Sequence, residues 1–250
     1  MKKRRSHWRG ILLPVLICIL AAVYAGVIHQ KDIALPEPAC SDAAESTGIA
    51  DTDPGSIPDY SGVDVIELNG GRPCFTERDL QRITGEHYSE LDAYGRCGPA
   101  AAMLDRSMMP SESRGSIGRV RPTGWRQRKY PGLVDSEPPY LYNRCHLIAY
   151  AMTGQNANPL NLITGTRYMN AVTMLPYEEA VLRYLDDSGN HVLYRVTPDF
   201  RGSELVARGL ELEACSVEDH GAGICFHVYL YNIQPGVEID YLTGESRLAD

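Results

Sequence analysis

The sequence is poor in the features that mark several classes of protein. It has no C-x-x-C pair, so cysteine spacing predicts no structural zinc site. With 23 Gly, 16 Pro and 22% charged residues, it lacks the composition of collagen, of coiled coils and of a wholly disordered chain. It also lacks an excess of positive charge. The net charge is −8, which taken alone argues against a nucleic-acid partner, because phosphate binding normally leaves a basic surface.

Charge is absent from residues 10–28, which are rich in Leu, Ile, Val and Ala. An uncharged run of 19 residues is about the length of a helix that crosses a bilayer. Five cations precede it in residues 1–9. The positive-inside rule therefore predicts a cytoplasmic basic tail, a single transmembrane signal-anchor and a cell-membrane protein whose remainder is exported. A cleaved signal peptide, which makes the protein secreted, is the alternative.

The rest of the chain divides into a spacer and a domain. Residues 29–60 hold one lysine and seven acidic residues, and this composition predicts a disordered acidic linker. Residues 61–250 are then the folded extracellular domain. This domain has 18 Lys and Arg against 25 Asp and Glu, so its own net charge is −7.

Acidic residues are missing from one segment of that domain, residues 114–129, which carries six cations. Its glycines and prolines predict a loop or an irregular strand. A solvated surface accounts for such a run, but guanidinium groups in a loop also suit the gripping of phosphate oxygens in pairs. The summed charge therefore hides a local basic patch.

Hydrophobic patterning predicts an α+β domain with an antiparallel sheet flanked by helices. A short helix is expected after Thr76, the N-cap, with Asp79 at the third helical position. Pro176 suits the first turn of another helix. The other expected helices span residues 99–108, 166–175 and 176–185. The expected strands span residues 139–148, 191–197, 204–217 and 224–233, with a turn at 241–244.

The chemistry is concentrated between residues 140 and 180. Arg144 and His146 lie two apart, which places a cation and an imidazole on the same face of a strand. Asparagines follow in residues 158–170, and Glu178 and Glu179 come next. A strand-ending His, a loop and a helix with a hard oxygen ligand suit a phosphodiesterase. The imidazole takes a proton from water, and an amide oxygen holds hydrated Mg²⁺. Each residue alone fits equally well a packed core His or a turn Asn.

The run NRCHL, followed by NPLNLITGTRYMN, resembles the DNA/RNA non-specific endonucleases, and specifically the bacterial DNA-entry nuclease branch. The resemblance extends from about residue 88 to residue 248 and includes GSIGRVRPTGW and PGVEIDYLTGES. It implies a ββα-metal (His-Me finger) core. Two positions depart from the family signature D-R-G-H: Asn143 stands where Asp is common, and Cys145 where Gly is common.

The resemblance implies a role for each residue of the metal centre. His146 matches the general base, and Asn170 matches the single direct protein ligand of Mg²⁺, for which Mn²⁺ is a substitute. Glu178 is similar to the carboxylate that orders a metal-bound water, with Glu179 as the alternative. The implied reaction leaves a 5′-phosphate and a 3′-hydroxyl.

The resemblance also assigns residues around that centre. Arg144 resembles the signature arginine, and Asn161 matches an asparagine that positions either the loop or the phosphate. Arg126, Arg128 and Lys129 are the candidates for binding the nucleic-acid backbone. Since the family contacts backbone rather than base edges, little sequence preference is expected.

The chain has seven cysteines, an odd number. An exported domain is able to form disulfides, and the candidate pairs are Cys215 with Cys225, across a hairpin, and Cys74 with Cys97. Cys145 beside His146 suggests a Cys–His hydrolase. Adjacent residues in a strand point to opposite faces, however, so this pair is not expected to meet.

The predicted function is an Mg²⁺-dependent, sequence-non-specific endonuclease that acts on DNA outside the cell, with RNA left open as a second substrate. The alternative is a catalytically silent, membrane-tethered DNA-binding module that uses the same arginine loop. The implied partners are nucleic acid, through its phosphate backbone, and the membrane, through the N-terminal helix. The oligomeric state stays open.

Overall fold

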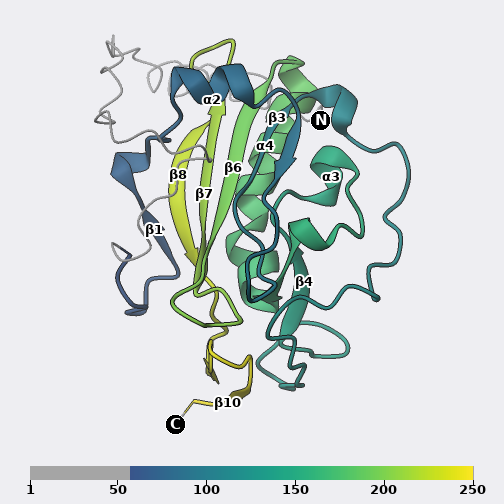
Figure 1. The fold of residues 1–250 in the computed structure, drawn as a ribbon, viewed down its shortest axis with the longest axis vertical. Helices are drawn as coiled ribbons and strands as arrows, with labels where there is room; N and C mark the ends of the chain where they lie inside the picture. The colour runs from purple at the N-terminus through teal and green to yellow at the C-terminus, as the bar shows by residue number, and fades with distance from the viewer. Residues whose placement is uncertain (1–56, 250) are drawn as a thin grey trace, which may run out of the picture. The chain divides into compact units, whose positions relative to one another are not determined.

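The computed structural model describes residues 57–249, and its largest element is an antiparallel sheet of six strands. The strands lie in the order β1-β8-β7-β6-β3-β2, so consecutive strands β6, β7 and β8 form a meander within the sheet (Figure 1). The strand bounds are Val65–Glu67 for β1, Glu86–Tyr88 for β2, Ala100–Leu104 for β3, Val192–Asp199 for β6, Gly209–Ser216 for β7 and Cys225–Tyr231 for β8.

The two faces of this sheet bury different kinds of side chain. On one face, Val196 and Leu212 join a hydrophobic core with Val181 and Leu185 of helix α4 (Leu175–Ser188). Neighbouring residues of a strand point to opposite faces of a sheet. The other face therefore presents the alternate residues of β6, β7 and β8. These include four buried charged or titratable side chains, Arg195, Glu211, Glu213 and His227.

A two-stranded sheet leads directly into α4. Strands β4 and β5 pair antiparallel, with His146 opposite Leu162, and they contribute Cys145 and Ile163 to the same core as α4. The order strand, strand, helix is the ββα arrangement that the resemblance implied. The bounds are Tyr142–His146 for β4, Tyr150–Thr153 for α3, Pro159–Asn161 for the 3-10 turn η4, Leu162–Thr166 for β5 and Met169–Thr173 for the π-helical turn η5.

Short elements complete the fold. Strands β9 and β10 form a small antiparallel hairpin near the C-terminal end of the described chain (Figure 1). The bounds are Asn69–Gly71 for the 3-10 turn η2, Glu77–Arg82 for α2, Arg106–Met108 for the 3-10 turn η3, Val237–Ile239 for β9 and Ser246–Leu248 for β10.

Local sequence signals predicted several elements correctly. The Thr76 hydroxyl accepts a hydrogen bond from Asp79 N, and the Asp79 carboxylate accepts one from Thr76 N, which completes the predicted capping box of α2. The three strands expected within residues 191–233 are β6, β7 and β8, and the strand expected within 139–148 is β4. The late turn is also present, at residues 241–243.

The helix predicted over residues 99–108 is wrong. Ala100–Leu104 is strand β3, which pairs with β2 on one side and β6 on the other. Three consecutive alanines in it are fully buried. Alanine favours a helix over other ordinary residues by less than about 0.7 kcal/mol per residue. Hydrogen bonds to two neighbouring strands outweigh so small a preference.

The two helical pieces predicted over residues 166–185 form one continuous segment. The π-helical turn η5 runs into α4 without a break, and Pro176 lies in the first turn of α4, as predicted. The N–H of Met174 donates to Met169 O at 2.9 Å, five residues back rather than four. Such wide turns recur at functional sites.

The predicted basic tail, the transmembrane segment and nearly all of the linker fall outside the described residues. Within residues 57–249, no helix is both long and apolar enough to cross a membrane. Ile57, assigned to the linker from composition, is buried against Tyr229 and Tyr231. The packed part of the chain therefore includes at least residue 57.

Of the two suggested cysteine pairs, one is brought together by the fold. Cys215 and Cys225 lie directly opposite each other on β7 and β8, although both are thiols in this structure. Cys97 is a buried thiol in the main core, so the suggested pairing of Cys74 with Cys97 is wrong. Cys18 and Cys40 fall outside the described residues.

Candidate active site

His146 ends strand β4, and its ring is held in one orientation. The side chain is nearly buried, with 6% of its surface exposed. Its Nε2 atom lies 2.9 Å from the carbonyl oxygen of Asn156. A carbonyl oxygen only accepts hydrogen bonds, so Nε2 must carry the hydrogen. In the neutral ring the lone pair then belongs to Nδ1, which makes Nδ1 the proton acceptor.

Arg114 lies beside that acceptor. One of its guanidinium nitrogens is 3.4 Å from His146 Nδ1, and a guanidinium only donates, which agrees with a lone pair on Nδ1. Burial, and next the positive charge of Arg114, lower the pKa of His146, against hydrogen bonds that raise it. The imidazole is therefore neutral at neutral pH and able to accept a proton there.

Asn161 holds the chain that follows His146. It is completely buried, and its side chain donates to Ile148 O at 2.9 Å and accepts from Ile148 N at 2.8 Å. Its own carbonyl accepts from Leu147 N. Both ends of the amide are thus spent on the backbone. Of the two roles that the resemblance left for Asn161, this geometry matches positioning of the loop.

Asn170 and Glu178 lie eight residues apart across the π-helical turn. In an α-helix, eight residues turn through about 80° more than two full turns. A wider i to i+5 turn lowers the rotation per residue and takes up part of this excess, so the two side chains are expected to point in more similar directions than in a regular α-helix. The start of this segment is fixed by the Thr166 hydroxyl, which accepts from Met169 N at 3.0 Å.

Glu178 sits in a less polar setting than its neighbour. Burial, and then the charge of Glu179, raise its pKa to about 7, while Arg114 opposes the shift. Glu179 is exposed. Arg114 therefore acts electrostatically on both His146 and Glu178.

A cavity of about 410 Å³ opens beside Arg114, although neither His146 nor Glu178 is among its lining residues. Its basic lining residues are Arg114, Arg144 and Arg167, and Asn143 and Asn170 line it with them. The wall contains no acidic residue among those that the structure describes. Three guanidinium groups beside an amide oxygen form a site for phosphate oxygens, whatever the sign of the whole chain.

Arg144 is anchored in this wall. Its Nε donates to Val120 O at 2.5 Å, another nitrogen donates to Gly118 O at 3.0 Å, and its guanidinium lies 4.3 Å from the centroid of the Trp125 ring. These contacts tie strand β4 to the basic segment, so Arg144 both lines the cavity and fixes the loop that shapes it.

The three predicted backbone-binding cations lie elsewhere. Arg126 is paired with Glu245 at 3.8 Å, Arg128 donates to Ser246 O at 2.8 Å, and Lys129 stands over the Tyr140 ring. The cavity lining does not include any of them. The basic segment was the right place to look, but its first residue, Arg114, is the one that reaches His146. Arg167 was missed although it stands within the quoted motif.

This arrangement agrees with comparisons to known proteins. The model of the DNA/RNA non-specific endonuclease family matches residues 77–218. The chain belongs to this family. It is therefore a hydrolytic endonuclease that acts on nucleic acid, and the inference from its net charge alone was wrong. Three arginines are gathered locally, in the wall of the cavity.

Solved structures support the membership. NucA from Streptococcus agalactiae is 29% identical, with 78% of this endonuclease and 92% of NucA covered and a TM-score of 0.65 without metal. The magnesium-bound form of NucA gives a TM-score of 0.66. Sda1 nuclease, solved with a bound zinc ion, is 27% identical, with 67% of this chain and 82% of Sda1 covered and a TM-score of 0.57.

The donor set of the endonuclease fits a hard divalent cation. The side chain of Asn170 lines the cavity and has no hydrogen-bond partner within residues 57–249, so its amide oxygen is available as a ligand. The Glu178 carboxylate is expected to point in a similar direction. Oxygen donors of this kind suit Mg²⁺, which keeps several of its waters.

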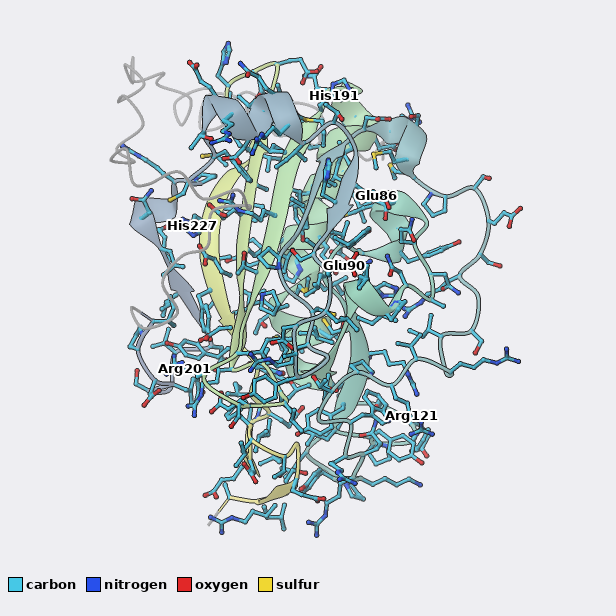
Figure 2. All side chains as sticks on the ribbon, viewed as in Figure 1. Glu86, Glu90, Arg121, His191, Arg201 and His227 are labelled. Carbon is cyan, nitrogen blue, oxygen red and sulfur yellow. The ribbon has the colours of Figure 1, made fainter. Side chains whose placement is uncertain are left out.

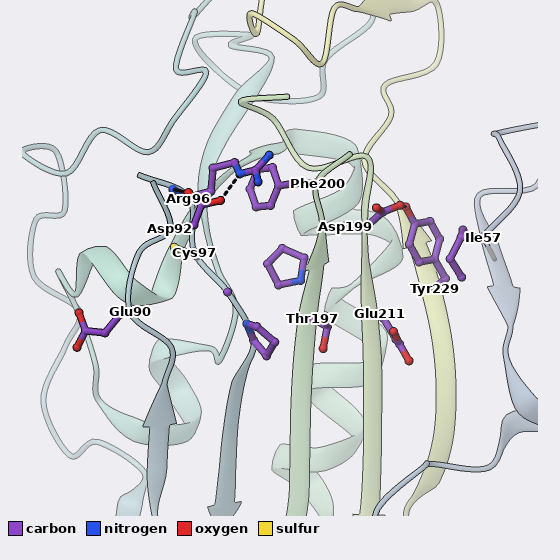
Figure 3. A pocket seen from close by; sticks show the side chains of 13 residues that line it. Ile57, Glu90, Asp92, Arg96, Cys97, Thr197, Asp199, Phe200, Glu211 and Tyr229 are labelled. Carbon is purple, nitrogen blue, oxygen red and sulfur yellow. Dashed lines mark hydrogen bonds and ion pairs between the residues drawn. The ribbon is translucent and has the colours of Figure 1, made fainter. Parts of the chain in front are cut away.

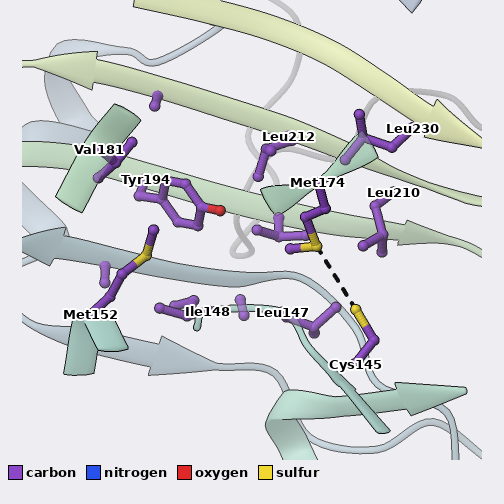
Figure 4. Close-up of a cluster of buried hydrophobic side chains, with 14 of the residues drawn as sticks. Cys145, Leu147, Ile148, Met152, Met174, Val181, Tyr194, Leu210, Leu212 and Leu230 are labelled. Atoms are coloured by element: carbon purple, nitrogen blue, oxygen red, sulfur yellow. Dashed lines mark hydrogen bonds between the residues drawn. The ribbon is translucent and has the colours of Figure 1, made fainter. Parts of the chain in front are cut away.

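Cys145 takes no part in this centre. It belongs to the core, where its Sγ lies 3.8 Å from Met174 Sδ (Figure 4). Burial raises the pKa of its thiol, which opposes formation of the nucleophilic thiolate. Its side chain points away from the His146 face of β4, as strand alternation predicts.

A smaller cavity of about 190 Å³ is lined in part by Thr197 and Glu211 of the six-stranded sheet (Figure 3). Arg96, Asp199 and Tyr229 are among the residues that line it, and none of the predicted site residues does. Asp92 and Asp199 supply acid where phosphate binding requires cations, so this cavity does not compete with the basic one as a nucleic-acid site.

Proposed function

We propose that this endonuclease hydrolyses phosphodiester bonds of DNA with His146 as the general base and Asn170 as the protein ligand of Mg²⁺. The observation that carries the proposal is the ring of His146, whose Nδ1 holds the lone pair and lies beside Arg114, a residue that lines a basic cavity. Mn²⁺ is expected to substitute for Mg²⁺, because both are hard cations that accept oxygen ligands.

The first chemical step is proton removal. Nδ1 of His146 takes a proton from a water molecule as its oxygen attacks phosphorus, while Nε2 keeps its hydrogen on Asn156 O. The ring does not need to rotate. The carbonyl of Asn156 holds the ring in place, and the side chain of Asn161 holds the backbone that follows His146. The P–O3′ bond breaks and the departing O3′ takes a proton from solvent water, which leaves a 5′-phosphate and a 3′-hydroxyl.

The second requirement is stabilisation of the charge on phosphorus. Arg114 lies beside the attacking side and is placed to donate to a non-bridging phosphate oxygen. A bound Mg²⁺ supplies neutralisation of the leaving oxygen. Asn170 would hold the ion through its amide oxygen, and Glu178 would accept a hydrogen bond from one of the waters of the ion.

The substrate is held through its backbone. Arg114, Arg144 and Arg167 line the cavity and bind phosphate, a group that carries no sequence information. Little base preference follows, with RNA remaining a second substrate class. We also propose more distant phosphate contacts for Arg126, Arg128 and Lys129. To make these contacts, the three side chains would have to leave their present partners.

We further propose that the endonuclease acts outside the cell, tethered by residues 10–28. The support is the sequence of those residues: five cations, then 19 residues without charge. Protease treatment of intact cells that express the full chain tests this orientation. Loss of the domain with retention of a cytoplasmic N-terminal tag is expected, and a domain that stays protected contradicts it.

The catalytic proposal is tested by plasmid digestion with the wild type, His146→Ala and His87→Ala, each with Mg²⁺ and with EDTA. His87 is an exposed histidine on β2 and serves as the matched control. We expect EDTA and His146→Ala each to abolish cleavage and His87→Ala to cleave normally. Equal cleavage by His146→Ala contradicts the mechanism. Binding without cleavage by the wild type would instead indicate the silent DNA-binding module.

A further inference from the structure

A second group of ligand-type side chains meets on the face of the six-stranded sheet opposite α4. One ligand atom each from Cys74, Glu213 and His227 lies within 4.8 Å of the other two. Glu213 and His227 are each 1% exposed, and Cys74 is half-buried (Figure 2 labels His227). We propose that these three side chains bind Zn²⁺ and thereby hold the segment before α2 on the sheet. This goes beyond the proposed function and does not depend on it.

The spacing between Cys74 and His227 is close to that of a formed site. Tetrahedral zinc with its usual bond lengths to sulfur and nitrogen separates those two atoms by about 3.6 Å. Cys74 Sγ lies 4.0 Å from His227 Nδ1, and Cys74 sits on a loop rather than on a strand. Glu213 Oε1 lies 3.9 Å from the other ring nitrogen, Nε2, so binding requires its side chain to shift toward Nδ1.

The histidine is already oriented for a metal. Its Nε2 lies 2.5 Å from a Glu211 carboxylate oxygen, and this leaves Nδ1 facing Cys74. A carboxylate on the far nitrogen is the usual support of a metal-binding histidine. Nδ1 donates to Arg72 O at 3.1 Å, so a bound ion replaces that hydrogen. The carbonyl oxygen of Arg72 is therefore a fourth potential ligand atom, beside the sulfur, nitrogen and oxygen of the other three residues.

Glu213 is held in place from both sides. It accepts from Cys74 N at 2.7 Å and from Arg195 Nε at 2.6 Å. Arg195 in turn lies under the Phe75 ring at 4.9 Å. With a thiolate at Cys74, a bound Zn²⁺ replaces two protons, that of the Cys74 thiol and that on His227 Nδ1, so the net charge of the group does not change. The buried group therefore accepts the ion without uncompensated charge, which burial would otherwise penalise.

The ligand chemistry selects zinc over magnesium. A thiolate and an imidazole suit Zn²⁺, whereas Mg²⁺ takes oxygen ligands. The site is also separate from the catalytic one, because Glu213 and His227 lie on the sheet face opposite the core that packs against α4. Because these ligands are far apart in sequence, they form no recognisable spacing. A search for C-x-x-C pairs therefore could not find them.

The test uses the full chain, stripped of metal and titrated with Co²⁺ and with Zn²⁺. Cobalt bound to a thiolate shows charge-transfer absorption in the near ultraviolet, which oxygen ligands do not produce, so the catalytic centre is silent in this readout. Cys74→Ser removes the proposed sulfur ligand. Cys225→Ser, which removes an exposed cysteine outside the group, is the matched control.

We expect one equivalent of thiolate-bound cobalt in the wild type and in Cys225→Ser, and none in Cys74→Ser. Zinc at a hundredfold excess over its dissociation constant is expected to raise the Tm of the wild type by roughly 5–10 °C. Absence of the absorption band from the wild type overturns the proposal, as does its persistence in Cys74→Ser. The wild-type titration decides the question even if Cys74→Ser does not fold. Nuclease activity in Mg²⁺ is expected to survive Cys74→Ser, so this outcome is independent of the catalytic proposal.

Discussion

The carbonyl oxygen of Asn156 accepts a hydrogen bond from His146 Nε2 at 2.9 Å, and this contact leaves the lone pair of the neutral ring on Nδ1. Asn156 lies in the loop between β4 and β5, so the hairpin that carries His146 also sets its tautomer. The free Nδ1 then lies 3.4 Å from Arg114. The chemistry of the centre rests on this pair of contacts.

Arg114 should control the pH dependence. The proposed active form has a neutral His146 and an ionised Glu178. Because the pKa of His146 is lowered and that of Glu178 is raised to about 7, both groups contribute to the acid limb of activity. Arg114→Gln removes a charge that lowers both pKa values, so the acid limb of the kcat/KM profile should move to higher pH. The loss of a donor to the phosphate should reduce kcat/KM by about 10²- to 10³-fold.

Arg126→Gln is the matched control for this experiment, because Arg126 belongs to the same basic segment but is exposed and paired with Glu245. Its acid limb should coincide with that of the wild type. An unchanged limb in Arg114→Gln would show that Arg114 does not act on His146.

The two adjacent glutamates should behave differently. Glu178 is expected to point in a direction similar to that of Asn170, whereas Glu179 is exposed. Glu178→Gln should raise the Mg²⁺ concentration for half-maximal activity by about 10- to 100-fold, and Glu179→Gln should leave it nearly unchanged. The measurement is plasmid cleavage over a magnesium titration. The reverse order would assign the role to Glu179, the alternative suggested by the resemblance.

Asn161 should matter for stability as well as for rate. Asn161→Ala leaves the buried N–H and C=O of Ile148 without their side-chain partners. Leaving such groups unpaired costs about 1–3 kcal/mol each, so the free energy of unfolding should fall by roughly 2–4 kcal/mol. Urea denaturation measures this. Cleavage should weaken through kcat rather than KM. A variant with wild-type stability and raised KM would indicate a substrate contact instead.

Cys215 and Cys225 should form a disulfide under oxidising conditions. They face each other across β7 and β8, next to the hydrogen-bonded pair Ser216 and Ile224. Such a non-hydrogen-bonded position brings the Cα atoms within about 4.5 Å, inside the range of a disulfide. With oxidised glutathione as oxidant, peptide mapping should find this bond, and the stability should rise by roughly 2–3 kcal/mol. Persistence of both thiols under those conditions contradicts the prediction.

The sequence by itself determined the parts whose information is local. Thr76 and Asp79 announce a helix start because the capping box involves residues three apart. Alternation between His191 and Ile233 predicts the meander because neighbouring strands follow one another. The runs around His146 and Asn170 were enough to identify the family, its ββα order and its candidate base and metal ligand.

The tertiary structure decided what depends on residues distant in the chain. Pairing with two strands made Ala100–Leu104 a strand against its helical composition. The path of an irregular loop, which no periodicity encodes, brought Arg114 to His146 and turned Arg126 and Lys129 away. The fold alone gathered Cys74, Glu213 and His227, because a sheet face combines strands far apart in sequence. Local sequence patterns thus identified the candidate catalytic motif. Three-dimensional packing decided which charged side chains lie beside it.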